Sequence, residues 1–247
     1  MDLLLGTLTL RPYVFVFFAV YLAAASADLG WRRTFAFASW VWPVALLAEL
    51  TSTRTGFPFG LYHYTGTTRG REIFVADVPL MDPLSFTFLA YGAFCLARAT
   101  LGSRWQAAWA RALLSGVLMM LIDVVVDPLA VRGERWFLGG IFEYAEPGPY
   151  FGVPLTNFAG WILVGTVGVG GYLRVAGRAG APRPGDVRPG IALYYCVVGF
   201  NLAVTAWLGE WALLLCGGAL HAVLAGVLYT VATRAAPTVR HRGLEVE

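Results

Sequence analysis

Stretches of about twenty apolar residues recur along the whole chain. A helix needs roughly 20 mostly apolar residues to cross the hydrocarbon core of a bilayer. Because lipid offers no hydrogen-bond partners, each crossing segment is expected to be an α-helix. We therefore predict an all-α, polytopic integral membrane protein that forms one domain over residues 1–247. Its seven expected transmembrane helices cover approximately residues 12–28, 34–53, 79–101, 107–129, 153–174, 189–208 and 211–233.

Composition supports lipid as the solvent and excludes several classes of function. Charged residues make up 13% of the chain, whereas about 25% is usual for a soluble domain. The net charge of +3 is too small and too scattered to indicate nucleic-acid binding. The sequence contains no lysine, so a retinal Schiff base cannot form. Its three histidines are too few for a histidine-rich di-iron site. We expect no metal and no cofactor, and chemistry based on carboxylates, hydroxyls, amides and aromatic rings.

The arginines predict the orientation in the membrane. With seven spans, one side of the bilayer receives twelve of them: Arg32, Arg33, Arg98, Arg104, Arg111, Arg174, Arg178, Arg183, Arg188, Arg234, Arg240 and Arg242. The other side receives the remaining six: Arg11, Arg54, Arg69, Arg71, Arg132 and Arg135. Cytoplasmic loops carry the excess of basic residues. The pattern predicts a multi-pass protein of the plasma membrane with a cytoplasmic C-terminus.

The acidic residues gather at the opposite face. On this topology the outer ends of the spans and the following loop carry Glu49, Asp77, Asp82, Asp123, Asp127, Glu143 and Glu146, together with Asn157. A carboxylate near the hydrocarbon core costs several kcal/mol unless it is paired, neutralised or facing a wet cavity. Such residues are therefore candidates for a functional site.

Asp123 and Asp127 are the strongest of these candidates. Residues four apart share one face of a helix, and two nearby, partly desolvated carboxyl groups are not expected to ionise together. One of them should hold a proton near neutral pH and could act as a general acid. The alternative is that these acids cap helix ends or pair with Arg54, Arg132 and Arg135; for Asp82, close to a helix start, capping has equal weight.

Two long outer loops are rich in aromatic residues, glycine and proline. They cover residues 55–64 and 136–154. Non-helical backbone at membrane depth persists only where it is buried in protein or lines a cavity. We expect both loops to cover one face of the helix bundle as an aromatic lid, the alternative being an interfacial aromatic belt.

These loop motifs resemble those of the bacterial and archaeal carotenoid-biosynthesis membrane proteins. The similarity covers about residues 49–161. It begins with Glu49 and the run Thr55-Gly56-Phe57-Pro58-Phe59-Gly60-Leu61-Tyr62-His63-Tyr64, followed by Val78-Pro79. It continues with Asp123-x-x-x-Asp127-Pro128, Trp136, Tyr150-Phe151-Gly152-Val153-Pro154-Leu155, Asn157 and Gly160-Trp161.

The resemblance implies a carotenoid hydratase that needs no redox cofactor. Such enzymes add water to the terminal 1,2-type double bond of an acyclic (ψ) carotenoid end and form a tertiary alcohol. The resemblance implies substrates of lycopene, γ-carotene or bacterioruberin type. It also implies that membrane lipid surrounds the protein and that it can associate with other carotenoid-pathway enzymes.

The residues suggest how such a reaction could run. A protonated carboxyl group would protonate the alkene, and water would capture the resulting tertiary cation. We assign the acid to Asp123 or Asp127, and the water-orienting base to the other aspartate together with Glu49. The expected binding residues are Asn157, Tyr62, Tyr64, Trp136, Tyr150, Trp161, Phe59 and Asp82.

Three other functions compete with this interpretation. A lycopene cyclase also begins by protonating a ψ end. A Mg²⁺-dependent prenyltransferase could use the two aspartates to bind a diphosphate. A transporter or proton channel would use the acids to line a path. Apart from His221 and Asn201, however, the inner halves of the spans offer few polar groups to carry a solute across.

Overall fold

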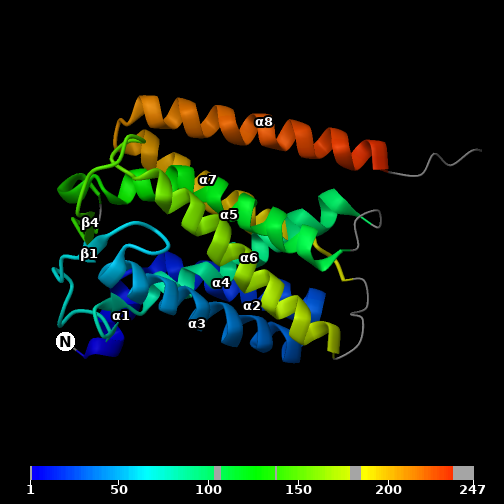
Figure 1. Ribbon diagram of the computed structural model, residues 1–247, viewed down its shortest axis with the longest axis horizontal. Coiled ribbons are helices and arrows are strands. Elements are labelled where there is room, and N and C mark those ends of the chain that lie inside the picture. The colour runs from blue at the N-terminus through cyan, green and yellow to red at the C-terminus, as the bar shows by residue number, and fades with distance from the viewer. Residues whose placement is uncertain (1, 103–106, 137, 179–184, 236–247) are drawn as a thin grey trace, which may run out of the picture.

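The computed structural model describes residues 2–102, 107–136, 138–178 and 185–235, and it confirms the all-α membrane fold (Figure 1). Seven of its helices are long and apolar enough to cross a bilayer. These are α2 (Pro12–Leu29), α3 (Trp31–Thr55), α4 (Met81–Leu101), α5 (Ala108–Ala130), α6 (Leu155–Arg178), α7 (Arg188–Trp207) and α8 (Trp211–Ala235). They coincide closely with the predicted spans.

The sequence did not indicate a short eighth α-helix, α1 (Leu3–Leu10), at the start of the chain. Proline and glycine residues define the ends of the helices that follow. Pro12 occupies the first turn of α2, where its missing N–H costs nothing. Gly30, with φ +79°, separates α2 from α3, and Gly56 ends α3 in the left-handed conformation.

The two long loops meet at one end of the bundle, as expected (Figure 1). Strand β1 (Tyr62–Tyr64) comes from the first loop and β4 (Phe142–Tyr144) from the second, and they pair antiparallel with Tyr62 opposite Tyr144. A smaller pair, β2 (Phe74–Val75) with β3 (Val78–Pro79), leads into α4, and the 3₁₀ turn η1 (Gly133–Arg135) follows α5. The loops thus form a common cover.

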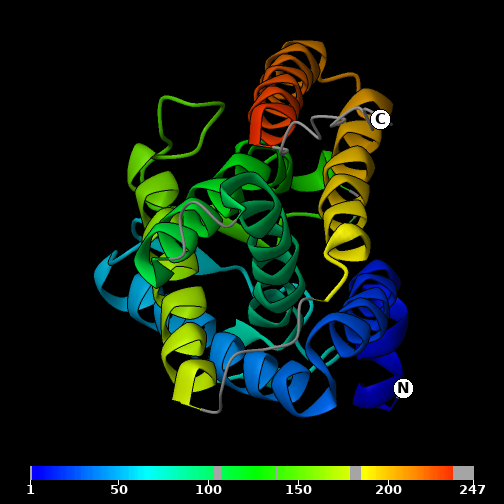
Figure 2. The ribbon, with the colours of Figure 1, turned by 90° about the vertical axis from the view of Figure 1, so that its right-hand side faces the viewer.

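Helix α4 lies at the centre of the bundle and α8 at its edge. Of the apolar window of α4, 67% of residues are buried, against 22% for α8. Seen along the bundle, the N-terminal helices and the C-terminal pair α7 and α8 lie around α4 and α5 (Figure 2). The large apolar side chains exposed on these outer helices, such as Val16, Leu47 and Leu215, suit contact with lipid.

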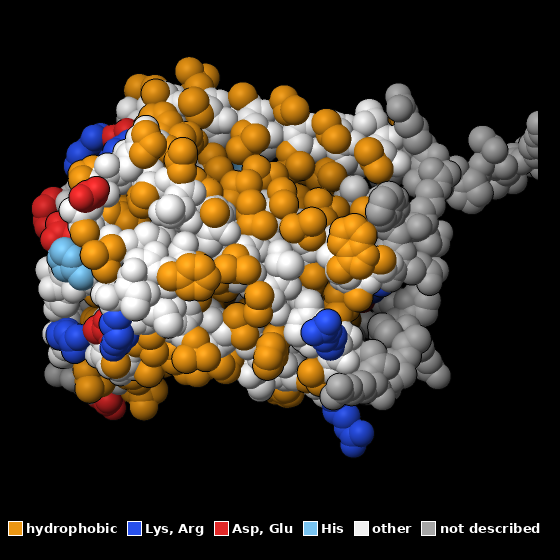
Figure 3. All heavy atoms as spheres, in the orientation of Figure 1, with side chains coloured by type: hydrophobic (Ala, Val, Ile, Leu, Met, Phe, Trp, Pro, Cys, Tyr) orange, Lys and Arg blue, Asp and Glu red, His pale blue; other side chains and the backbone are white. Residues whose placement is uncertain are grey.

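Charged groups concentrate at the two ends of the molecule and leave an apolar belt between them (Figure 3). The predicted arginines Arg104, Arg183, Arg240 and Arg242 lie outside the described residues. The inner ends of the spans also hold an acid that the sequence interpretation overlooked. Asp28 is buried there and accepts hydrogen bonds from Arg98 and Tyr91. Its negative charge is therefore neutralised by Arg98 within the helix bundle.

Helices α5 and α6 make the closest approach in the bundle. A Cβ atom built on Gly116 of α5 would lie 2.4 Å from the Ile162 carbonyl oxygen of α6. One built on Gly165 would lie 2.8 Å from the Gly116 Cα. Small residues allow such backbone contact between membrane helices. This contact fixes the two helices that carry Asp123, Asp127 and Asn157.

We predict that Gly116→Ala lowers the melting temperature of the purified protein, because the added methyl group forces α5 and α6 apart. The expected cost in unfolding free energy is about 1–3 kcal/mol. Gly218→Ala in α8 is the matched control, since no atom lies within 4 Å of its would-be Cβ. Equal melting temperatures for the two variants would contradict this account of the α5–α6 contact.

Candidate active site

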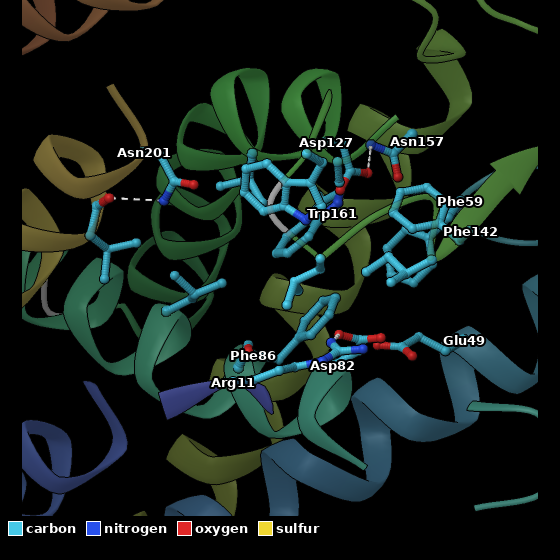
Figure 4. A pocket seen from close by; sticks show the side chains of 18 of the residues that line it. Arg11, Glu49, Phe59, Asp82, Phe86, Asp127, Phe142, Asn157, Trp161 and Asn201 are labelled. Atoms are coloured by element: carbon cyan, nitrogen blue, oxygen red, sulfur yellow. Dashed lines mark hydrogen bonds and ion pairs between the residues drawn. The ribbon is translucent and has the colours of Figure 1, made fainter. Parts of the chain in front are cut away.

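A cavity of about 160 Å³ lies beneath the paired strands (Figure 4). Helices α2 to α7 contribute to its walls, and β1 and β4 close it at the loop end. Its volume resembles the ~150 Å³ apolar cavity that accepts benzene in another protein. A branched hydrocarbon end of a few carbons would therefore fit.

Asp123, Asp127 and Asn157 form a polar cluster on one wall. The Asn157 Nδ2 donates to Asp123 Oδ2 at 2.6 Å and to Asp127 Oδ2 at 2.8 Å. The two carboxyl groups are therefore held close together. Asp127 and Asn157 line the cavity, whereas Asp123 lies behind them and is fully buried. One amide thus holds both carboxyl groups in place.

Tyr144 of β4 completes this cluster from above. Its hydroxyl donates to Asp127 Oδ2 at 3.1 Å. Burial, with the nearby Asp127 carboxylate, raises the pKa of the Tyr144 phenol, so it remains a hydrogen-bond donor. The loop therefore orients the carboxyl group that faces the cavity.

Glu49 occupies the opposite wall, with Asp82 beside it (Figure 4). It is buried in α3, and its Oε2 accepts a hydrogen bond from the Tyr64 hydroxyl of β1 at 2.8 Å. Burial and the Asp82 charge raise the pKa of the Tyr64 phenol, which keeps it a donor. Carboxyl groups therefore face the cavity from two sides.

Arg11 supplies the positive charge of the site. Its side chain is 2% exposed and forms ion pairs with Glu72 and with Asp82, whose side chains are 0% and 23% exposed. Asp82 lies in the first turn of α4, but the N-cap position of this helix is occupied by Leu80. Its role in the structure is thus to pair with Arg11, rather than to cap the helix as the alternative interpretation suggested.

Aromatic rings fill the space between the polar walls. Trp161 of α6 stacks on Phe86 of α4, with ring centroids 4.3 Å apart and planes within 8°. Phe59 packs against both rings from the first loop. Tyr62, Trp136 and Phe142 also line the cavity. The interior is therefore apolar and rich in π-electron faces.

Most residues predicted for the site meet at this cavity. Its lining includes Glu49, Asp127, Asn157, Tyr62, Tyr64, Trp136, Trp161, Phe59 and Asp82. Tyr150, also predicted for the site, packs its ring against Phe151 and Phe158 and is not among the residues that line the cavity. Residue spacing in an irregular loop does not reveal which of two nearby tyrosines, Tyr144 or Tyr150, points inward.

Among the described residues, the arginines proposed as alternative partners do not pair with Asp123 or Asp127, although Arg54 does pair with Asp77, another acid of this face. Arg132 and Arg135 pair with Glu210. The midspan candidates have structural contacts as well: a His221 ring nitrogen meets the Leu121 carbonyl, and Asn201 donates to the Val197 carbonyl. Asn201 also lines the cavity.

Sequence reasoning missed Arg11, Glu72 and Tyr144. Arg11 was counted only as an outer arginine, and Glu72 was not considered. An arginine next to an apolar span, with acids at the same face, could have suggested a buried ion pair. For Tyr144 the only available signal was the alternation of aromatic residues in Phe142-Glu143-Tyr144.

The chain matches a known protein family over most of its length. Residues 7–225 match the family described as carotenoid biosynthesis protein. The chain belongs to this family. The matched range contains the cavity and all the polar residues described around it.

A curated relative carries a more specific name. A bisanhydrobacterioruberin hydratase from Haloarcula japonica is 37% identical over 121 residues. The aligned region covers 49% of this chain and 38% of that relative, so the match covers well under half the length of the curated protein. No solved structure matches the chain.

We predict that Arg11→Leu destabilises the folded protein, because it leaves two acids buried without their countercharge. Removing one partner of a buried ion pair costs about 3–5 kcal/mol. Thermal unfolding of the purified protein would measure the effect. Arg54→Leu is the control, since its pair with Asp77 is exposed and such pairs contribute about 0–1 kcal/mol. Similar losses in both variants would contradict a special role for Arg11.

Proposed function

We propose that this chain is an intramembrane carotenoid hydratase that adds water to the terminal double bond of an acyclic carotenoid end. The observation that carries the proposal is the apolar, aromatic cavity with carboxyl groups on two walls. Family membership supplies the substrate class, and the cavity suits the end group of such a molecule. The name of the Haloarcula relative further supports hydration as the reaction.

Asp127 is the proposed proton donor to the alkene, because it is the member of the aspartate pair that lines the cavity. The amide nitrogen of Asn157 donates to one oxygen of each aspartate. Two carboxyl groups this close are expected to share a proton, since ionising both would place like charges together in an apolar setting. Asp123 then acts through Asp127 as a positioning residue.

Protonation of the less substituted alkene carbon leaves a tertiary cation. Faces of Trp161 and Phe86 can stabilise a cation by roughly 0.5–2 kcal/mol each and remain chemically inert. The carboxylates of Glu49 and Asp82 provide longer-range electrostatic stabilisation from the opposite wall. An aromatic cavity bounded by carboxylates thus suits this intermediate.

Water captures the cation in the second step. Its oxygen bonds to the tertiary carbon, and a carboxylate, with Glu49 the candidate, accepts the proton that is released. The product gains one hydrogen and one hydroxyl group, and no electrons are exchanged with another molecule. Glu49 has then gained one proton and the aspartate pair has lost one, so net return of this proton from Glu49 to the pair restores the site.

Expression in cells that accumulate lycopene, γ-carotene or a C50 bacterioruberin precursor tests this proposal. We expect extracted pigment heavier by one water molecule, with an unchanged visible spectrum because the conjugated chain is untouched. Asp127→Asn should lower the yield by roughly 10²–10⁴-fold at an unchanged protein level in the membrane. Asp77→Asn, which removes an acid of the exposed Arg54 pair, is the control and should retain activity.

Each other outcome points to a different function. A shifted spectrum with no change in mass would indicate a cyclase. Product formation that requires Mg²⁺ and a prenyl diphosphate would indicate a prenyltransferase. No new pigment from any of the acyclic carotenoids would contradict the hydratase proposal, and full activity of Asp127→Asn would remove this residue from the mechanism.

The excess of arginine at the other end supports an orientation with the cavity end facing away from the cytoplasm. We predict that His63→Cys reacts with a membrane-impermeant maleimide in intact cells, because the His63 side chain is exposed on strand β1. Exposed Cys196 and Cys216 are first replaced by serine. Labelling that appears only after the cells are opened would reverse the orientation.

A further inference from the structure

The cavity accommodates the reacting end of a carotenoid but not the rest of the molecule. Its volume of about 160 Å³ matches a benzene-sized group, whereas the attached polyene is many times longer. This consideration rests on the proposed function. The apolar polyene gains most by lying in lipid, so it must leave the cavity between two helices.

The rings of Tyr13, Phe17 and Phe200 mark the place where it can leave. All three line the cavity, and all three are only partly buried. Phe200 of α7 stacks on Tyr13 of α2 with centroids 5.4 Å apart. It meets Phe17 edge-on at 5.8 Å. At this point α2 and α7 touch through side-chain rings.

The outer surfaces of α2 and α7 near these rings are also apolar. Val16 and Val20 of α2 are 60% and 42% exposed. On α7, Gly199, the residue before Phe200, is exposed. A chain that emerges here would meet lipid and not a polar group.

Helix α6 packs more closely against its neighbours than α2 does against α7. Helices α5 and α6 meet at backbone contact through Gly116 and Gly165. The same holds for α6 and the first loop, where a Cβ on Gly160 would lie 2.7 Å from the Pro58 carbonyl oxygen. Backbone contacts of this kind cannot open by side-chain rotation. Rings can, because rotamer changes at partly exposed positions occur within nanoseconds.

We infer that the gap between α2 and α7, closed by Tyr13, Phe17 and Phe200, is the binding channel through which the polyene of an acyclic carotenoid passes from the cavity into lipid. The end group lies between the aspartate pair and Glu49. The first part of the conjugated chain then replaces the ring contacts between α2 and α7. Phe200 is thereby a residue that determines which chain lengths react.

Pigment retention and turnover together test this channel. Purified wild-type protein in detergent should retain an acyclic carotenoid. The Phe200→Trp variant should retain at least about tenfold less of it. We also expect the ratio of turnover on the carotenoid to turnover on a short acyclic terpene with the same terminal alkene to fall about tenfold. Phe35→Ala is the control, since Phe35 is an exposed ring of α3 that stacks on Trp31 away from the cavity.

A cross-link made after folding removes misfolding as an explanation. Phe17→Cys with Phe200→Cys, in a chain whose Cys196 and Cys216 are serine, is joined by a cleavable bifunctional thiol reagent. Carotenoid retention should fall on cross-linking and return on cleavage. Single-cysteine variants treated with the same reagent should show neither change.

The outcomes separate the channel from the reaction. If the wild type retains pigment but adds no water to it, and if this retention is lost on cross-linking, the channel is supported and the hydratase proposal is contradicted. Unchanged retention in Phe200→Trp and in the cross-linked protein would overturn the channel. Failure of the wild type to retain any acyclic carotenoid would overturn it too, as would an equal loss of turnover on long and short substrates.

Discussion

The burial of Arg11 among acids organises the loop end of the molecule. A guanidinium that is almost inaccessible to solvent needs carboxylates around it, and these come from two other segments: Glu72 from the loop between β1 and β2, and Asp82 from the start of α4. The ion pairs therefore join the α1–α2 junction, the loop and the central helix at one point. Because Asp82 also lines the cavity, the same interaction that fixes the fold sets the charge on one cavity wall.

The paired strands extend this control to the carboxyl groups. Alternate residues of a strand share a face, and with Tyr62 opposite Tyr144 and Tyr64 opposite Phe142 the four rings pack together on one side. From that side Tyr64 reaches Glu49 and Tyr144 reaches Asp127. A slip of one residue would turn these rings to the other face. Strand register thus determines how both carboxyl groups are oriented.

Sequence patterns predicted the spans well because lipid leaves the backbone few options, so hydropathy alone locates the helices. The meeting of Glu49, Asp127 and Asn157 also followed, since topology places span ends at one face. The loops were harder. Their conformation depends on pairing between segments far apart in sequence, so Tyr144 was missed, and Tyr150 packs against Phe151 and Phe158 rather than lining the cavity. Arg11 was missed because a buried and an interfacial arginine look alike in sequence.

The separation of acids onto two walls has a physical consequence for an apolar ligand. A cavity lined by several free carboxylates would hold water tightly and would repel a hydrocarbon. Here Arg11 compensates the charge of Asp82 on one side. On the other, the Asn157 amide and the Tyr144 phenol donate to the aspartate pair. Each wall thus presents carboxyl groups that are already hydrogen-bonded or ion-paired, and Trp161 and Phe86 cover the space between them. A hydrocarbon end can enter such a space, and the carboxylates can still respond electrostatically when positive charge develops on it.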